Sequence, residues 1–552
     1  MKPALKALMM AAMLGSTMLA APATAMAQSA TTTTATPAAL ATLFTEWRSF
    51  QASGEKNGAP DFSAAELSRK RAGLKTMQAR LAAIDTSGWS PSALVDYNIV
   101  RGEMNGLDFD LRVLKPWERD PAWYNSVWAA QSDTPSHEGP TLPRLVELWQ
   151  YNFPLSSADS AKLAAELAHV PPLLQGARGW LTGNARDLWT SGTGTMADQA
   201  ETLAKLRNLV GNGDPKLVKA ITNAETATND FVAWLKAETP KKTGPSGVGK
   251  ENYTWYLRNV QLSDLSWEQE VAILRRELAR AHAALRLEEH RNRKLPQLAG
   301  VTSPAAYDAQ AEASVDKFIG FLGQNDILTV RDYMRPALMK RVDSYVPPEK
   351  QNFFAISMHR APMTLWTHFY HWWDLEMMAA DPQPSDIRRG PLLYNLWLSR
   401  SEGMATAMEE MMLHAGLFDD DPRAREIVWI MQAQRAARGL ASLYMQANMI
   451  DMPAAMKMQV TRTPNGWMSP TLPLLASEQQ IYLRLPGYGP SYITGKYQIE
   501  KLYAERAEAQ GKAFSTKAFF DELNSYGMIP VSLIRWQMLG KDDEAEALGM
   551  KR

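Results

Sequence analysis

The sequence has 552 residues, with 59 basic and 59 acidic side chains and no cysteine. The charge balance argues against a nucleic-acid-binding protein, because such proteins concentrate basic side chains on one face. The absence of cysteine excludes disulfides, thiolate metal ligands and a cysteine nucleophile. The chain is long enough to bury a large core and to form two or more lobes.

The N-terminal segment has the pattern of a secretory signal peptide over residues 1–27. Lys2 and Lys6 precede the apolar run ALMMAAMLGSTMLA, and the small residues Ala25 and Ala27 fit an A-x-A cleavage site. We expect the Ser/Thr/Ala-rich tether that follows, up to residue 40, to be disordered. No later stretch has about 18 consecutive apolar residues, so no membrane span is expected once the signal is removed. The sequence therefore predicts a periplasmic protein.

Helical periodicity dominates the rest of the chain. In residues 266–294, Ser266 and Gln269 form a capping box. The apolar residues that follow recur at spacings of three and four, as on one face of a helix: Val271, Leu274, Leu278, Ala281 and Leu285. Long alternating runs of β-branched and aromatic residues are missing. The sequence predicts a mainly α, multi-helix fold with at most a small peripheral sheet.

Proline and glycine mark the expected loops. These are residues 238–250, 345–351, 381–391, 461–473 and 485–492. The first is the predicted boundary between an N-terminal helical lobe (41–240) and a C-terminal helical lobe (250–552). The reason is that histidine and aromatic residues gather after it, and the candidate site is expected in the second lobe.

Histidines cluster in one part of the chain. Within 56 consecutive residues lie His359, His368, His371 and His414. If LWTHFYHWWDLEMM (365–378) is one helix, His368 and His371 share a face, because residues three apart are neighbours on a helix. A divalent metal needs three or four nitrogen or oxygen donors. Glu402 or Glu409, two turns apart on one predicted face, could supply a third.

A packing role is the simpler interpretation of this segment. H-x-x-H is a weak metal motif, because zinc helices usually space their histidines by four and place a glutamate after the first, where Phe369 stands here. Methionines at helical spacing usually fill core gaps, and this is expected of Met404, Met408 and Met411. The chain has no G-x-S-x-G, P-loop or G-x-G-x-x-G motif, so serine hydrolase and nucleotide-binding functions lose their usual support.

Six segments, taken together in their order and spacing, carry a family resemblance. They are DYNIVRGEMNGLDFDLRVLKPWERDPAWY (96–124), VGKENYTWYLRN (248–259), RSEGMATAMEEMMLHAGLF (400–418), QAQRAARGLASLY (432–444), YLRLPGYGPSYITGKYQIEKL (482–502) and FFDELNSYGMIPVSLI (519–534). The chain resembles Domain of Unknown Function 885, a family of helical bacterial proteins grouped by fold with the gluzincin-type zinc peptidases. The resemblance covers nearly the whole mature chain and implies a gluzincin-like helical fold.

The chain departs from this family at the metal motif. Family members usually carry H-E-x-x-P-G-H-H some twenty to thirty residues before the E-G pair that corresponds to Glu402 and Gly403. Here THFYHWWDLEMM (367–378) has neither a His-Glu pair nor Pro-Gly, and RGLASLYMQANM (438–449) lacks the later family pattern R-x-x-x-D-x-x-x-H. Only Glu402 matches a family metal ligand. The resemblance therefore implies a degenerate zinc motif.

The resemblance also implies which residues surround the cleft. It implies that Tyr488, Tyr492 and Lys496, on a loop and the helix after it, lie next to the old active site. Further polar groups expected close by are Arg435, Arg438 and Arg484. Flat apolar surfaces that could bind substrate come from Trp366, Trp372, Trp373 and Trp397.

Three functions remain open. The first is an exported enzyme repurposed for non-proteolytic, lyase-type acid/base chemistry on a small molecule, an aromatic one included, with these catalytic residues: His368, His371, Glu402, Tyr492 and Lys496. The second is a metal-dependent hydrolase or peptidase, in which His368, His371 and Glu402 bind zinc or another divalent ion and Asp374 or Glu376 is the base or supports the ligands. The third is a non-catalytic binding protein. No other cofactor is expected.

Overall fold

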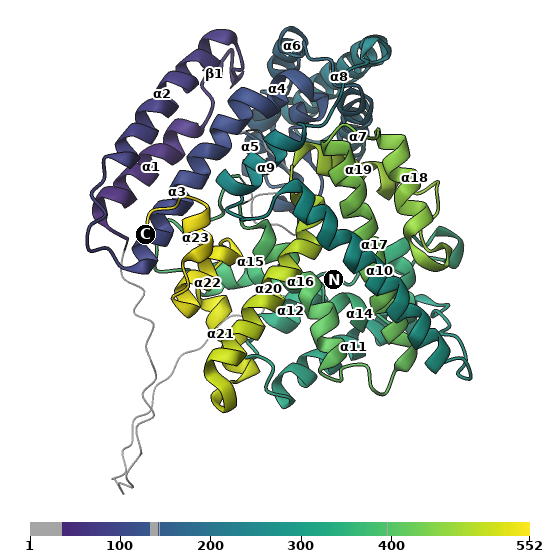
Figure 1. Cartoon of the computed structure of the whole chain (residues 1–552). Helices are drawn as coiled ribbons and strands as arrows, with labels where there is room; N and C mark the ends of the chain where they lie inside the picture. Colours follow the sequence, from purple (N-terminus) through teal and green to yellow (C-terminus); the bar gives the residue numbers. More distant parts are fainter. Residues whose placement is uncertain (1–35, 133–141, 143, 395) are drawn as a thin grey trace, which may run out of the picture. The chain divides into compact units, whose positions relative to one another are not determined.

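Helices form most of the structure, as the periodicity predicts. The computed structural model describes residues 36–132, 142, 144–394 and 396–552 (Figure 1). The expected signal peptide and most of the expected tether lie outside these residues. The described part belongs to one compact unit that spans Thr34–Arg552.

The helices of the first half of the chain begin at residue 38. They are α1 (Ala38–Gln51), α2 (Ala64–Ala82), α3 (Pro91–Phe109), α4 (Pro116–Arg119), α5 (Ser157–Leu167), α6 (Val170–Trp180), α7 (Arg186–Val210) and α8 (Pro215–Glu238). Helices α1, α2 and α3 pack against one another, and α8 packs against α5, α6 and α7 (Figure 1). Helix α3 continues into a π-helical turn, η1 (Asp110–Leu114).

The helices of the second half carry the predicted site residues. They are α9 (Lys250–Asn259), α10 (Trp267–Arg291), α11 (Pro304–Gln324), α12 (Met334–Met339), α13 (Phe353–Arg360), α14 (Met363–Trp366), α15 (Tyr370–Ala380), α16 (Leu398–His414), α17 (Pro422–Gln446), α18 (Met452–Arg462), α19 (Pro473–Arg484), α20 (Tyr488–Gln510), α21 (Thr516–Ser525), α22 (Val531–Leu539) and α23 (Asp543–Ala547). Helix α19 packs against α7, and α9 and α22 pack against α3. The division into two lobes stays a prediction.

Strands are short, so the predicted mainly α fold is confirmed. In the described residues, β1 (Glu55–Lys56) pairs antiparallel with β2 (Ala59–Pro60). β3 (Val127–Trp128) pairs parallel with β4 (Val146–Glu147). None of these two-residue strands reaches the candidate site described below. No helix of the described part combines the length and the apolar character that crossing a membrane requires.

The features predicted around residue 266 are confirmed. The Ser266 side chain accepts a hydrogen bond from the Gln269 backbone, and the Gln269 side chain accepts one from the Ser266 backbone. These bonds satisfy backbone donors that the first turn of a helix leaves unpaired. All five apolar residues predicted to form a stripe on α10 are buried. Through this face α10 packs against α17.

Two glycine contacts bring the central helices close together. A Cβ on Gly403 of α16 would lie 2.4 Å from the backbone of Gly495 on α20, and a Cβ on Gly495 would lie 2.4 Å from the carbonyl oxygen of Ser399. Between α17 and α20, a Cβ on Gly439 would lie 3.0 Å from the carbonyl oxygen of Gly489. Only glycine permits such backbone approach. The contacts hold α16, α17 and α20 together. The candidate site described below takes Glu402 from α16, Arg435 and Arg438 from α17, and Tyr488 and Tyr492 from α20.

Two local predictions were wrong. The stretch 365–378 is not one helix, because α14 ends at Trp366 and α15 begins at Tyr370. At the break, the Thr364 and Thr367 hydroxyls donate to the carbonyl oxygens of residues 361 and 364, and such local bonds compete with helix formation. The predicted loop 485–492 ends at Gly487, whose φ of 89° fits glycine. Tyr488 and Tyr492 are therefore both on α20.

Candidate metal centre and adjoining cavity

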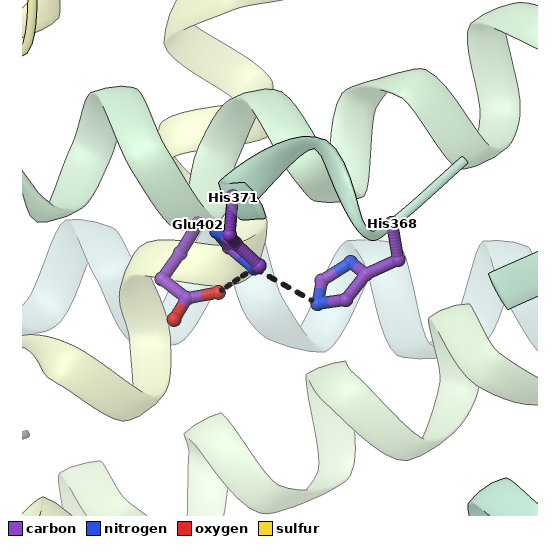
Figure 2. Close-up of side chains that lie close together, drawn as sticks. All are labelled: His368, His371 and Glu402. Atoms are coloured by element: carbon purple, nitrogen blue, oxygen red, sulfur yellow. Dashed lines mark hydrogen bonds and ion pairs between the residues drawn. The ribbon is translucent and has the colours of Figure 1, made fainter. Parts of the chain in front are cut away.

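Three side chains from separate elements meet beside the break between α14 and α15. His368 lies in the turn between these helices, His371 in the first turn of α15, and Glu402 in the first half of α16. Figure 2 shows the two imidazoles and the carboxylate pointing toward one another. The helix break does not separate the two histidines, because His371 follows His368 by only three residues.

The donor atoms are at distances that suit one shared ion. Nε2 of His371 lies 3.3 Å from Nε2 of His368 and 3.2 Å from Oε2 of Glu402 (Figure 2). One ligand atom from each of the three residues lies within 4.8 Å of the others. Around a tetrahedral zinc ion with bonds of about 2.0–2.1 Å, neighbouring ligand atoms are about 3.3 Å apart. The two shortest distances therefore match the edges of a zinc tetrahedron.

The carboxylate of Glu402 supports the same interpretation. Glu402 is 1% exposed, and its Oε2 faces Nε2 of His371 at 3.2 Å. A buried carboxylate needs a cation or a proton donor beside it, and either a shared metal ion or a proton on His371 would meet this need. Two imidazoles and one carboxylate are also the donors that catalytic zinc sites use, with a fourth position for water. The residues present thus fit a divalent ion.

A second layer of polar groups lies beside the two imidazoles. The Ser401 hydroxyl lies 3.1 Å from Nδ1 of His371, and Oε1 of Glu409 lies 3.0 Å from Nδ1 of His368. Glu409 is itself held by the Arg435 guanidinium and by the Gln432 amide. A hydrogen on Nδ1 of His371, donated to Ser401, would leave the Nε2 lone pair of His371 facing the common point. Glu409 lies close to Nδ1 of His368, but this nitrogen makes no hydrogen bond of good geometry with the described residues.

Burial and neighbouring charges set the protonation of this cluster. Burial, with the charges of Arg435 and a protonated His371, holds the pKa of His368 well below its ordinary value. Burial alone would raise the pKa of Glu402. The charge of a protonated His371 and a hydrogen bond from Tyr488 outweigh burial, so that the pKa lies below its ordinary value. A neutral His368 and an ionised Glu402 are forms that bind metal, whereas His371 must lose the proton that lowers the pKa of Glu402 before it can act as a ligand.

A cavity of about 660 Å³ opens beside His368. Its walls include His368, Tyr488 and Tyr492, whereas His371 and Glu402 lie behind them and are not among the lining residues. The His368 and Tyr492 rings stack with 5.9 Å between centroids, and Tyr488 stacks on Tyr492 at 5.8 Å. The volume is within the range of small-molecule sites.

The cavity has a polar side that carries charges of both signs. Its charged lining residues are Arg341, Asp343, Arg435, Arg438 and Glu478. Arg435 pairs with Glu409 and Arg438 pairs with Glu478. The Arg438 guanidinium also lies 4.0 Å from the centre of the Tyr492 ring, within the range of a cation–π contact. The rest of the wall is largely apolar and aromatic.

Comparison with known proteins identifies the family. The family model described as "Bacterial protein of unknown function (DUF885)" matches residues 46–363 and 371–538. The chain belongs to the DUF885 family. The seven residues between the two matched stretches contain His368. No curated protein matches this DUF885 chain.

Solved structures share the fold of this DUF885 protein. A "putative lipoprotein of unknown function" from Shewanella oneidensis is 16% identical with a TM-score of 0.66, over 91% of this chain and 99% of that chain. A "putative lipoprotein" from Colwellia psychrerythraea is 14% identical with a TM-score of 0.62, over 93% and 99% of the two chains. At such identities the likeness shows the fold alone.

The four tryptophans predicted to bind substrate are buried beside the DUF885 site. None is among the described residues that line the cavity. Trp366 donates to the Ser314 hydroxyl, Trp373 to the Met334 carbonyl and Trp397 to the Leu392 carbonyl. The Arg341 guanidinium lies 3.0 Å from the centre of the Trp372 ring. These contacts place the four rings in the packed layer behind the histidines.

Two of the polar residues expected at the cleft lie elsewhere. Lys496 is 1% exposed and its ammonium lies 2.9 Å from Glu410 and 2.8 Å from Glu500. Arg484 donates to Asp120 at 2.7 Å and lines a different cavity. Arg435, Arg438, Tyr488 and Tyr492 do line the predicted cleft.

The two carboxylates considered as a base are engaged with cations. Asp374 is buried 3.2 Å from Arg400, and Glu376 lies 3.0 Å from Lys340 at the surface. Neither is among the described residues that line the cavity. Burial raises the pKa of Asp374, and the charges of Arg400 and His371 oppose the rise. Asp374 is therefore a supporting group and not a base that meets substrate.

The remaining histidines and methionines have other surroundings. His359 lines the cavity, but its Nε2 accepts from the Val346 N–H and its Nδ1 donates to the Ala355 carbonyl, so both nitrogens are used. His414 is at the surface, 3.4 Å from Glu410. The packing role predicted for the methionines is confirmed: Met404 and Met408 are buried and Met411 packs against the core.

Ser401 and Glu478 were missed by the sequence analysis. Ser401 is fully buried beside His371, and Glu478, 6% exposed on α19, pairs with Arg438 across 40 residues of sequence. A serine next to a candidate ligand carries no distinctive signal. A glutamate on a helix is usually solvated, so its burial opposite an arginine is visible only in three dimensions.

Proposed function

We propose that this protein is an exported, metal-dependent hydrolase that acts on a small anionic molecule with an apolar or aromatic body. The observation that supports a metal is the convergence of His368, His371 and Glu402 at distances that fit a zinc tetrahedron. The signal-peptide pattern of residues 1–27 supports export to the periplasm. This choice differs from the first sequence hypothesis, since convergence favours the metal alternative.

The three ligands would leave one position open toward the cavity. When bound, a divalent ion lowers the pKa of a water in that position to about 7 and polarises a carbonyl or phosphoryl oxygen. His368 is the ligand that reaches the cavity wall, so we expect the open position on its side. Ser401 would keep Nε2 of His371 directed at a bound ion.

The cavity residues would bind and orient the substrate. Arg438 lines the cavity and pairs with Glu478 through one nitrogen, and Arg341 and Arg435 line the cavity as well. Planar guanidinium groups suit an anionic substrate group. The rings of Tyr488 and Tyr492 belong to the wall next to His368 and offer flat surfaces to an aromatic substrate.

A metal-free acid/base function, of lyase type, is the second candidate. It is supported by the position of His371, whose Nε2 is within 3.3 Å of both His368 and Glu402. A proton on this nitrogen could pass to either neighbour, which makes His368 a proton donor or acceptor at the cavity wall. The two functions compete for the same nitrogen, since a metal ligand cannot carry the proton.

Metal analysis of the purified mature protein tests the proposal. We expect about one zinc or other divalent ion per chain in the wild type and in His414→Ala, a control that removes an exposed imidazole. We expect none in His371→Ala. A chain that keeps no metal but turns over a substrate in the presence of chelator would support the acid/base function. If the purified protein contains no metal and turns over no substrate, a non-catalytic binding function remains.

A further inference from the structure

A second cavity, of about 390 Å³, lies in another part of the fold. It is bounded by residues of α2, α3, η1 and α9 and by Leu393 and Tyr394 of the segment before α16. No described residue lines both this cavity and the one beside His368. Its contents are therefore independent of the proposed metal centre.

Four charged side chains line this cavity: Lys70, Asp110, Glu147 and Arg484. Arg484 pairs with Asp120 and Glu147 accepts a hydrogen bond from Gln150, so Lys70 and Asp110 are the two considered as ligand-binding groups. Lys70 is 6% exposed, and its ammonium donates to the Gln51 carbonyl at 2.8 Å and to the Ser53 hydroxyl at 3.1 Å. This leaves one of its three hydrogens for a ligand. Asp110 is 7% exposed, and its carboxyl group forms no hydrogen bond or ion-pair contact with any described residue. Lys70 and Asp110 therefore share the cavity without touching.

The backbone explains why Asp110 faces the cavity. At Asp110 helix α3 changes to the wider π-helical turn η1, closed by a hydrogen bond from the Lys115 N–H to the Asp110 carbonyl. Asp110 and Leu114, at the two ends of this turn, both line the cavity. Single π-helical turns are rare and occur often at functional sites.

Aromatic rings form much of the remaining wall. They belong to Phe62, Trp117, Trp123, Tyr256 and Tyr394. Phe62 stacks on Trp117 with 5.9 Å between centroids and meets Trp123 edge-on at 5.7 Å. The Tyr394 ring lies against Gly106, one turn before Asp110, where a Cβ would come within 2.2 Å of it. Several ring faces beside one carboxylate form a surface that attracts an organic cation.

We infer that this cavity binds a small zwitterion of the amino-acid class, with its ammonium group at Asp110 and the aromatic rings and its carboxylate at Lys70. Asp110 then gains a cationic group within contact distance, and the third hydrogen of the Lys70 ammonium gains an anionic acceptor. The apolar part of the ligand contacts the ring faces. A ligand with only one charge would leave the opposite group without a partner.

The pKa values of the two groups are consistent with this assignment. Burial raises the pKa of Asp110 to about 8, with the charge of Lys70 opposing the rise. Burial also lowers the pKa of Lys70 to about 8. In both cases burial among the described residues disfavours the charged form. A zwitterion would favour the charged forms, because its own charges replace the lost solvation.

Ligand-binding measurements on the full mature chain test the inference. The standard L-amino acids are screened by thermal shift, and the best one is titrated by calorimetry beside its decarboxylated and deaminated analogues. For L-phenylalanine these are phenethylamine and 3-phenylpropanoate. We expect the amino acid to raise the melting temperature and each analogue to bind at least about tenfold more weakly. No stabilisation by any amino acid would overturn the inference.

Substitutions at the two charged groups supply the controls. Asp110→Asn and Lys70→Met should each weaken amino-acid binding at least about tenfold. Asp108→Asn, on the same helix but paired with Arg112 at the surface, and Lys75→Met, exposed on α2, should bind as the wild type does. Asp110→Asn removes an acid that burial disfavours, so we expect it to fold. Wild-type affinity in folded Asp110→Asn would contradict the inference.

Discussion

Nε2 of His371 lies 3.3 Å from Nε2 of His368, although His368 precedes α15 and His371 is the second residue of that helix. Each ring turns its Nδ1 away, toward Ser401 in one case and Glu409 in the other. Two imidazoles and a carboxylate whose ligand atoms lie this close could share one divalent ion.

Ser401→Ala should weaken metal binding without removing a ligand. The substitution deletes the hydroxyl 3.1 Å from Nδ1 of His371, and loss of such supporting groups typically lowers metal affinity about 10- to 100-fold. The measurement is a competition titration of zinc against a chelator of known affinity. Ser442→Ala is the matched control, because this buried hydroxyl on α17 has no hydrogen-bond partner among the described residues. Equal affinity in both variants would mean that Ser401 does not orient His371.

Gly403→Ala should destabilise the protein by forcing α16 and α20 apart. Its Cβ would lie 2.4 Å from the Gly495 backbone, which cannot move like a side chain. Overpacking of this kind costs about 1–3 kcal/mol of unfolding free energy. Gly194→Ala on α7 meets open space and should instead stabilise by up to about 1 kcal/mol. Thermal and denaturant unfolding compare the two, and a neutral Gly403→Ala would show that the interface can adapt.

Lys496→Met should reduce stability but leave metal binding unchanged. Lys496 is a buried cation among Glu277, Glu410 and Glu500, and removal of one partner from a buried ion pair costs about 3–5 kcal/mol. Arg280 still pairs with Glu277 and Glu410, so we expect the low end of this range. Melting temperature and zinc stoichiometry are measured together. Loss of zinc at an unchanged melting temperature would instead make Lys496 part of the site.

Glu270→Gln should remove one component of the pH dependence of stability. Burial raises the pKa of Glu270 from its ordinary 4.5 to about 7. The folded protein therefore binds this proton more tightly than the unfolded chain. The associated stability is present below pH 4.5 and is lost as the pH rises through 7, by about 3 kcal/mol. Relative to the wild type, the variant should gain stability between pH 5 and 8, measured by denaturant unfolding. Parallel curves for the two proteins would show that Glu270 does not titrate in this range.

Much of the fold follows from local signals in the sequence. The capping box at Ser266 and the apolar stripe behind it predict α10 almost to the residue, because both depend on short-range spacing. The break at Thr367 was not predicted, since threonine hydroxyl bonds to the backbone compete with the helix in ways that periodicity does not show. The start of α20 at Tyr488 was placed too late because Gly487 and Pro490 both suggest a loop. Here Pro490 lies in the first turn of the helix, where its missing N–H is tolerated.

The candidate site was partly predictable. His368 and His371 come close because the backbone between α14 and α15 continues in helical turns, so the predicted proximity survives the break, and the resemblance indicated Glu402. The positions of Lys496 and Arg484 could not be predicted, because their partners are far away in sequence: Arg484 pairs with Asp120 across 364 residues. The tryptophans were expected at the cavity for their flat surfaces, but the same surfaces pack equally well against the core.

Anomalous diffraction at the zinc edge tests the central claim most directly. Crystals of the mature protein, grown with about equimolar zinc, should show one strong anomalous peak between Nε2 of His368, Nε2 of His371 and Oε2 of Glu402, at about 2.0–2.2 Å from each. Crystals of His371→Ala should lack it. Wild-type crystals with no peak at this point, and with the His371 ring still hydrogen-bonded to its two neighbours, would contradict a metal centre.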